Sequence, residues 1–190
     1  MKRGIAVAAA ASLAAEACTV LVAGRKATAD GSTMVSHTTD AGGGTKDLRL
    51  VRIPAKDHPK GSKRAVLKHV QNYPRIVTND RSELYKPVEG QELSPVLGYI
   101  DEVEHTYAYW ELDYGLMNEH KLAMGESTVN ARTVGFPKDQ GNYGQCVMSI
   151  QELSRIGLER CKTSRCAVQT MGDLAVEHGF FSGQNNPKRP

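Results

Sequence analysis

The chain has 190 residues, of which 40% are hydrophobic and 24% charged, a composition that fits one globular domain and argues against a disordered, collagen-like or membrane-embedded protein. Its 24 basic and 21 acidic residues are intermixed and leave a formal net charge of only +3. Because the basic residues form no stripe, we expect no nucleic-acid partner.

Residues 1–17 have the pattern of a signal or leader peptide. Lys2 and Arg3 form a basic head, and an alanine-rich apolar run follows that is shorter than the roughly 20 residues of a membrane span. The run ends in small residues at Ala17, so cleavage there would make Cys18 the first residue of the mature protein. We therefore expect an exported protein with no membrane attachment once the leader is removed.

Two alternatives for this segment stay open. Alanine favours helix, so the run is also compatible with an ordinary N-terminal amphipathic helix. A lipid-modified Cys18 is the second alternative, and the charged Glu16 argues against it because lipid-attachment signals have a small residue there.

Residues 18–22 and 32–37 are rich in β-branched side chains and predict two strands. An Asp-Gly pair just before the second strand favours a tight turn, so the two strands are expected to form an antiparallel hairpin. Such a hairpin would bring Cys18 near His37 and Asp40.

The middle of the chain predicts further short strands. Residues 48–53 alternate apolar and basic side chains, which predicts a half-buried strand that ends at Pro54. Residues 56–94 are polar and interrupted by proline, which indicates loops and short strands. Residues 107–110 and 122–124 predict strands on either side of a turn at residues 118–120.

Two helices are expected after these strands. Ser149 and Glu152 form a capping box, and an apolar stripe continues from there to Val168, which predicts one long helix. A second, shorter helix is expected to follow Thr170 and to stop at Gly179. Strands first and helices afterwards predict an α+β fold.

Neither a disulfide nor a metal site is expected among the four cysteines of the chain. Cys161 and Cys166 are close in sequence, but five residues along one helix separate the Cα atoms by more than the roughly 7 Å that a disulfide allows. Zinc needs a second ligand pair that the chain does not offer, and no histidine spacing fits a metal site. We therefore expect no metal and no cofactor, and we interpret Cys146, Cys161 and Cys166 as structural thiols.

A cysteine at a new N-terminus carries its own base. The α-amino group has an ordinary pKa of about 7.7 to 8, so it can take the thiol proton as sulfur attacks a carbonyl and return it to the departing amine. An acyl-enzyme on Cys18 would then be hydrolysed by water, and backbone N–H, amide or hydroxyl donors would be needed for the oxyanion.

Three parts of the chain carry a recognisable pattern. The first comprises Cys18 and Thr19, residues 24–32 (GRKATADGS) and residues 36–40 (SHTTD). The second is residues 114–128 (YGLMNEHKLAMGEST), and the third is residues 152–161 (ELSRIGLERC). Together they resemble peptidase family C69, the dipeptidases related to penicillin V acylase and bile salt hydrolase, in which the second part is similar to the second signature and the third to the helix that follows it. The resemblance extends from Cys18 to about Phe181.

This resemblance implies an N-terminal-nucleophile hydrolase with an αββα sandwich, Cys18 as nucleophile and dipeptides as substrates. It implies that Asp40 is the carboxylate that orients the α-amine. His37 stands where the acylases have an arginine, which disfavours an acylase substrate, and simple strand packing remains an alternative for this residue.

The second signature implies further site residues. Asn118, Ser127 and Thr128 lie where the relatives place substrate and oxyanion contacts. For Asn118 the alternative is a turn residue that tolerates positive φ.

Members of the family are considerably longer than this chain, so we expect residues 18–181 to be the N-terminal part of the catalytic domain, with an incomplete sandwich, and residues 182–190 to be a divergent or truncated tail. The expected partner is a small peptide substrate, in a secreted or a lysosome- or vesicle-like setting, and a homo-oligomer is left open. The alternatives are an inactive fragment, a secernin-like non-enzymatic protein, or an amidohydrolase of the penicillin V acylase type.

Overall fold

The computed structural model describes residues 18–39, 46–127, 135–140 and 144–181; the expected leader (1–17) and tail (182–190) lie outside these ranges. In chain order the elements are β1 (Val20–Ala23), β2 (Met34–His37), β3 (Val51–Ile53), β4 (Lys56–Asp57), β5 (Lys63–Leu67), the 3₁₀ helix η1 (Glu83–Tyr85), β6 (Val96–Asp101), β7 (His105–Thr106), β8 (Tyr109–Glu111), β9 (Gly115–Asn118), β10 (Met148–Ser149), α1 (Ile150–Arg160), α2 (Ser164–His178) and β11 (Phe180–Phe181). This mixture of helices and small sheets confirms the α+β class.

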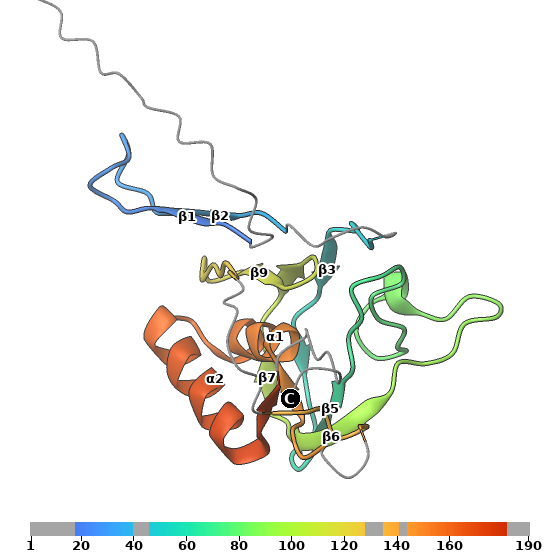
Figure 1. Ribbon diagram of the computed structural model, residues 1–190. Coiled ribbons are helices and arrows are strands. Elements are labelled where there is room, and N and C mark those ends of the chain that lie inside the picture. The colour runs from blue at the N-terminus through green and yellow to red at the C-terminus, as the bar shows by residue number, and fades with distance from the viewer. Residues whose placement is uncertain (1–17, 40–45, 128–134, 141–143, 182–190) are drawn as a thin grey trace, which may run out of the picture.

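The hairpin expected at the start of the described chain is present. Strand β1 pairs antiparallel with β2, and Val20 lies opposite His37. Gly31 has a φ of +74°, and the carboxylate of Asp30 accepts a hydrogen bond from the N–H of Ser32 at 3.0 Å, as the turn requires. The hairpin forms a layer of its own above β9 (Figure 1).

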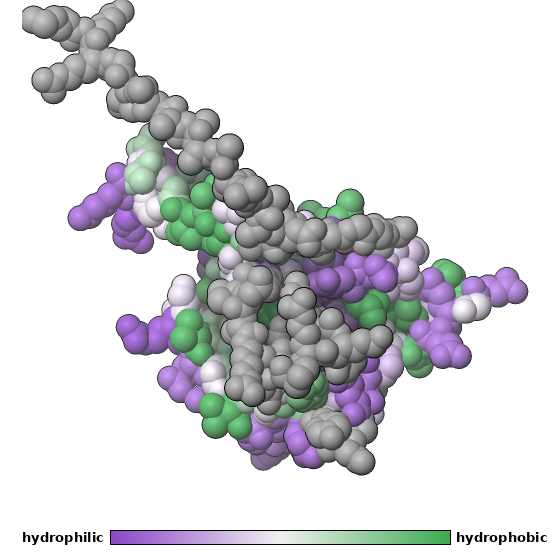
Figure 2. All heavy atoms as spheres, viewed as in Figure 1, coloured by the Kyte–Doolittle hydropathy of each residue, from purple (hydrophilic) through white to green (hydrophobic). Residues whose placement is uncertain are grey.

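The outer side of this hairpin is apolar and open to solvent. Leu21 and Met34, which lie on this side, are 68% and 57% exposed, and Figure 2 shows apolar side chains of the hairpin on the surface. On the inner side Val22 is also exposed, so the described residues cover the inner side only near Val20 and His37.

A three-stranded antiparallel sheet, in the order β3-β8-β9, lies beneath the hairpin. The pairs β5-β6 and β4-β7 are also antiparallel, whereas β10 and β11 pair in parallel. Residues 122–124 do not form the predicted strand, because only Ala123 makes an isolated bridge, to Met117. The predicted strand at residues 107–110 is shifted to β8, which begins at Tyr109.

Helix α1 runs through the middle of the molecule and is buried along almost its whole length. Leu158 belongs to an apolar cluster with Val51 and Tyr109, while Leu153 and Ile156 belong to a second cluster. Because apolar side chains of α1 enter both clusters, the helix joins the strands on its two sides. Helix α2 lies outside α1 (Figure 1).

The helix boundaries differ from those predicted. As expected, the Ser149 hydroxyl accepts a hydrogen bond from the N–H of Glu152, and Gly179, with a φ of +72°, ends the second helix. However, α1 ends at Arg160, and α2 begins already at Ser164, so it is the longer helix. The reason is Thr163, whose side chain caps α2 by accepting from the N–H of Cys166.

This break also overturns the prediction for the cysteines. Cys161 and Cys166 form a disulfide, with their Cα atoms 5.5 Å apart. The prediction assumed one continuous helix, but Cys161 has extended backbone (φ −121°, ψ 141°) and only Cys166 is helical. Cys18 and Cys146 have free thiols.

Among the helices of the described ranges, none has the length and apolar character needed to span a bilayer.

Candidate functional site

Cys18 continues β1 on the inner face of the hairpin. The strand pairing extends beyond the named strands, because Thr38 N–H donates to the carbonyl of Thr19 at 2.9 Å and Thr19 N–H donates to Thr38 Oγ1 at 3.0 Å. Side chains alternate between the faces of a strand, so Cys18 shares a face with Val20 and is the diagonal neighbour of His37. Its thiol is free and partly buried.

The second signature passes under this face of the hairpin. After β9 the chain turns back, and Met124 N–H donates to the carbonyl of Leu116 at 2.8 Å. It then reaches Gly125, where an added Cβ would lie only 2.9 Å from Val20 Cγ1. Glycine at this position therefore allows the returning segment to pack directly against β1.

The two sequence motifs meet at a hydrogen bond. Ser127 Oγ donates to the backbone carbonyl of Cys18 at 2.6 Å, although the two residues are 109 positions apart. Ser127 is thus brought to Cys18, as one expects of residues that share a site. Asp40 and Thr128, the other two residues predicted near the thiol, lie outside the described residues.

We call Cys18, His37, Ser127 and Tyr114 the Cys18 cluster, and Tyr114 is the member that the sequence did not single out. It is 5% exposed, and its ring lies edge-on to the imidazole of His37, with the ring centroids 6.1 Å apart. Burial, and next the negative charge of Glu126, raise the pKa of Tyr114 well above its usual value, so the phenol stays protonated. The only signal in the sequence was its place at the start of the second signature.

His37 contributes an unsatisfied polar atom. Its Nδ1 is shielded from solvent and has no hydrogen-bond partner within the described ranges. A buried ring nitrogen without a partner costs free energy, and a ligand group that bonds it would recover that cost. A pocket role and strand packing both remain predictions for His37.

Asn118 lies at the end of β9, and its amide is fully occupied. Its four hydrogen bonds join Nδ2 to the carbonyls of Leu158 (2.9 Å) and Cys161 (2.7 Å), and the N–H groups of His120 (3.0 Å) and Leu122 (3.1 Å) to Oδ1. The side chain is buried, and no amide donor remains for an oxyanion. These bonds favour the turn interpretation of Asn118, although the positive φ belongs to Lys121 (64°).

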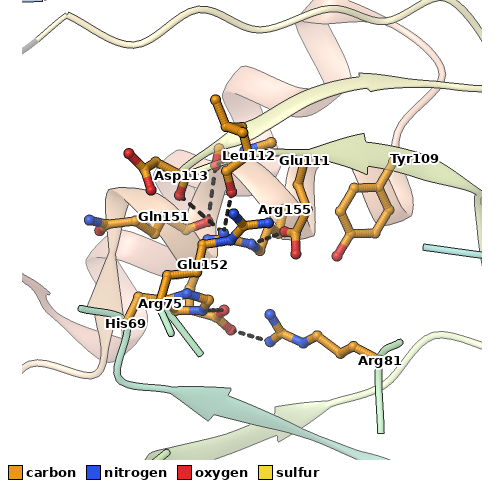
Figure 3. Close-up of polar contacts among 12 residues, drawn as sticks. His69, Arg75, Arg81, Tyr109, Glu111, Leu112, Asp113, Gln151, Glu152 and Arg155 are labelled. Carbon is orange, nitrogen blue, oxygen red and sulfur yellow. Dashed lines mark hydrogen bonds and ion pairs between the residues drawn. The ribbon is translucent and has the colours of Figure 1, made fainter. Parts of the chain in front are cut away.

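A network of buried charges ties α1 to the strands and loops around it (Figure 3). Glu152 accepts hydrogen bonds from Arg64 at 2.6 Å, Arg81 at 2.8 Å and His69 Nε2 at 2.6 Å. Arg155 pairs with Glu111 of β8 and donates to the backbone of the turn that precedes Tyr114.

Burial and neighbouring charges set the ionisation states of Glu152 and His69. Burial alone would raise the pKa of Glu152, but Arg64 and Arg81 hold it well below its usual value. Burial, and next the charge of Arg155, lower the pKa of His69 to about 4, so its bond to Glu152 is one from a neutral imidazole and not an ion pair. This network has no local signal in the sequence, because its members come from strands, loops and a helix that lie far apart in the chain.

A separate cavity of about 750 Å³ lies between β5, β6 and the segment 77–81. Its walls include Val77, Arg81 and Tyr99, and no residue of the Cys18 cluster borders it. In the described part of the chain, no group of three or more His, Cys, Asp or Glu side chains is arranged to hold a metal ion.

The model of peptidase family C69 matches residues 17–186, a stretch that contains the hairpin, the second signature and both helices. The chain belongs to peptidase family C69. No curated protein and no solved structure gave a match. Members of this family are peptidases, which hydrolyse peptide bonds. Of the two free thiols among the described residues, Cys146 is buried and Cys18 is only partly buried.

Proposed function

We propose that this C69 protein is a cysteine-type dipeptidase in which Cys18 is the nucleophile. The observation that supports this most is the 2.6 Å hydrogen bond from Ser127 to the Cys18 carbonyl, because it joins the first motif of the family to the second. A residue held by both motifs is well suited to a reaction that needs fixed geometry.

The proposed reaction begins when residues 1–17 are removed and Cys18 becomes N-terminal. The free α-amine accepts the thiol proton as sulfur bonds to the substrate carbonyl carbon, and the carbonyl oxygen takes the electron pair. The ammonium then protonates the leaving amine as the C–N bond breaks. Water hydrolyses the thioester, with the same amine acting as base, and the thiol is restored.

The other site residues have distinct proposed roles. Asp40 orients the α-amine, and Thr128, next to Ser127, contributes to the oxyanion site. His37 faces the substrate with its unsatisfied Nδ1. Ser127 holds the backbone of Cys18, and Asn118 supports the turn that leads to Ser127.

We further propose that the described residues are the N-terminal part of the αββα sandwich of N-terminal-nucleophile hydrolases. The apolar outer side of the hairpin supports this, since an inner strand of such a sandwich is covered on both faces. The protein is proposed to act outside the cell or in a vesicle-like compartment, where a leader is removed and the Cys161–Cys166 disulfide persists.

Two measurements test the function. Mass spectrometry of the full-length protein, expressed in a host that exports it, should show a chain that begins at Cys18. Dipeptide hydrolysis should be abolished in Cys18→Ala, at least 10³-fold below wild type, and strongly reduced in Cys18→Ser, because the nucleophile is lost or weakened.

The matched control is Cys146→Ala, which removes the other free thiol and should retain hydrolysis within about threefold. Undiminished turnover by Cys18→Ala would falsify the assignment of the nucleophile. Full activity in a protein that retains Met1 would exclude the α-amine as base.

A further inference from the structure

The backbone that carries Tyr114 is held rigidly against α1. Gly115 N–H donates to Ser154 Oγ at 3.0 Å, and an added Cβ on Gly115 would lie 2.7 Å from Leu158 Cδ1 and 3.0 Å from the Ser154 carbonyl. On the other side, the Tyr114 carbonyl accepts from Leu112 N–H at 3.0 Å. The start of β9 therefore cannot shift without disturbing α1.

From this rigid position the ring of Tyr114 reaches the inner face of the hairpin. It meets His37 at an interplanar angle of 66°, and His37 is the strand partner of Val20. Cys18 is the next side chain along that same face. Tyr114 is thus a buried hydroxyl-bearing side chain on the side of the hairpin toward which the Cys18 thiol points.

The protonation state of this phenol limits what it can do. Burial, and next the nearby carboxylate of Glu126, raise the pKa of Tyr114, so at neutral pH the hydroxyl is a hydrogen-bond donor and not a base. The side chain of Gln71 forms a hydrogen bond with this phenol, and the ring lies on the face of the hairpin that carries Cys18. A donor fixed on the same face as the nucleophile suits the stage at which negative charge develops on the substrate.

We infer that Tyr114 is a further catalytic residue, whose O–H donates a hydrogen bond to the oxygen of the scissile carbonyl as the Cys18 sulfur attacks. The inference rests on the proposed cysteine-peptidase function. The S–C bond forms, the carbonyl π electrons move to oxygen, and Tyr114 stabilises that oxyanion while keeping its own proton. When the oxyanion collapses and the C–N bond breaks, the hydrogen bond weakens again.

The test is Tyr114→Phe in the mature full-length protein, because phenylalanine keeps the ring against His37 and removes only the hydroxyl. We expect kcat for a dipeptide to fall about 10²- to 10³-fold, with KM within about threefold, as for the loss of one oxyanion donor. Inhibition by a dipeptide aldehyde, which forms a tetrahedral adduct with the thiol, should weaken by a similar factor. Alkylation of Cys18 by iodoacetamide, which forms no oxyanion, should keep its rate.

Tyr107→Phe is the matched control, since Tyr107 also lies edge-on to histidines (His105 and His120) and belongs to no part of the Cys18 cluster. It should keep wild-type kcat. Tyr114→Leu distinguishes hydroxyl from packing: a hydroxyl role predicts the same loss of kcat as in Tyr114→Phe, whereas a packing role predicts a larger loss in leucine.

Wild-type kcat in Tyr114→Phe, or an alkylation rate that falls as much as kcat, would overturn the role of Tyr114 and leave Cys18 as the nucleophile. If instead the wild-type protein and Cys18→Ala do not differ in hydrolysis, the proposed function itself has failed.

Discussion

At the scale of single residues, Asn118 shows how one position in a signature can have two interpretations. The sequence offered a substrate contact or a turn, and both explain an asparagine before a bend. Only the three-dimensional arrangement shows that the carbonyls of Leu158 and Cys161, at the end of α1, take both donors of its amide. Its side chain therefore ties the turn after β9 to the end of a helix 40 residues further along.

Asn118→Ala should lower the free energy of unfolding by about 2 to 4 kcal/mol, because four hydrogen bonds are lost and buried carbonyls remain unsatisfied. Urea unfolding followed by circular dichroism measures this change. The exposed Asn72, mutated to alanine, should change it by less than about 0.5 kcal/mol. Normal stability combined with a large fall in kcat would instead support the oxyanion role for Asn118.

At the scale of elements, local sequence signals predict the hairpin and the start of α1 but not the end of α1. The hairpin was predictable because its turn and both strands lie within 20 residues, and the start of α1 was predictable from Ser149. The predicted end of α1 was wrong because the apolar stripe continues through Cys161, whereas Thr163 caps a new helix. The error in the helix boundary then produced the error in the disulfide.

The disulfide should contribute about 2 kcal/mol to the free energy of unfolding, as expected for the short loop it closes. Cys166→Ala, or treatment of the wild type with dithiothreitol, should lower the urea midpoint, and the variant should no longer respond to reductant. Thiol titration of the denatured, unreduced wild-type protein should find two free thiols, those of Cys18 and Cys146. Four would show that the pair is not bonded.

At the scale of the whole molecule, the buried charges around α1 were beyond reach from the sequence. Helical periodicity can place Glu152 and Arg155 on α1, but it does not reveal that Arg64, His69 and Arg81 arrive beside them. The same holds for the contact between His37 and Tyr114. Long-range pairing depends on how the strands stack, and a single sequence carries no direct signal for it.

The network predicts acid sensitivity. His69 is neutral in the folded protein, with a pKa of about 4, but titrates near 6.5 when unfolded, so below pH 6.5 the unfolded state binds more protons. The free energy of unfolding should therefore fall as the pH drops from about 6.5 to 4, by about 3 kcal/mol in all. Loss of the Glu152 charge adds to this only at lower pH, because its pKa is depressed.

His69→Gln, which can still donate to Glu152 but does not titrate, should flatten the pH dependence between 6.5 and 5. His105→Gln, at a half-exposed histidine, should keep the wild-type slope. Urea unfolding at a series of pH values makes the comparison, and an unchanged slope in His69→Gln would contradict the role given to this histidine.

The hydrogen bond between Ser127 and Cys18 also sets an order of events during biosynthesis. The cysteine leaves the ribosome 109 residues before the serine that holds it, a delay of roughly 5 to 20 seconds at the usual rates of translation. Until then the backbone of Cys18 lacks its hydrogen bond to Ser127. Under the proposed function, the nucleophile is therefore synthesised well before the second signature that completes its site.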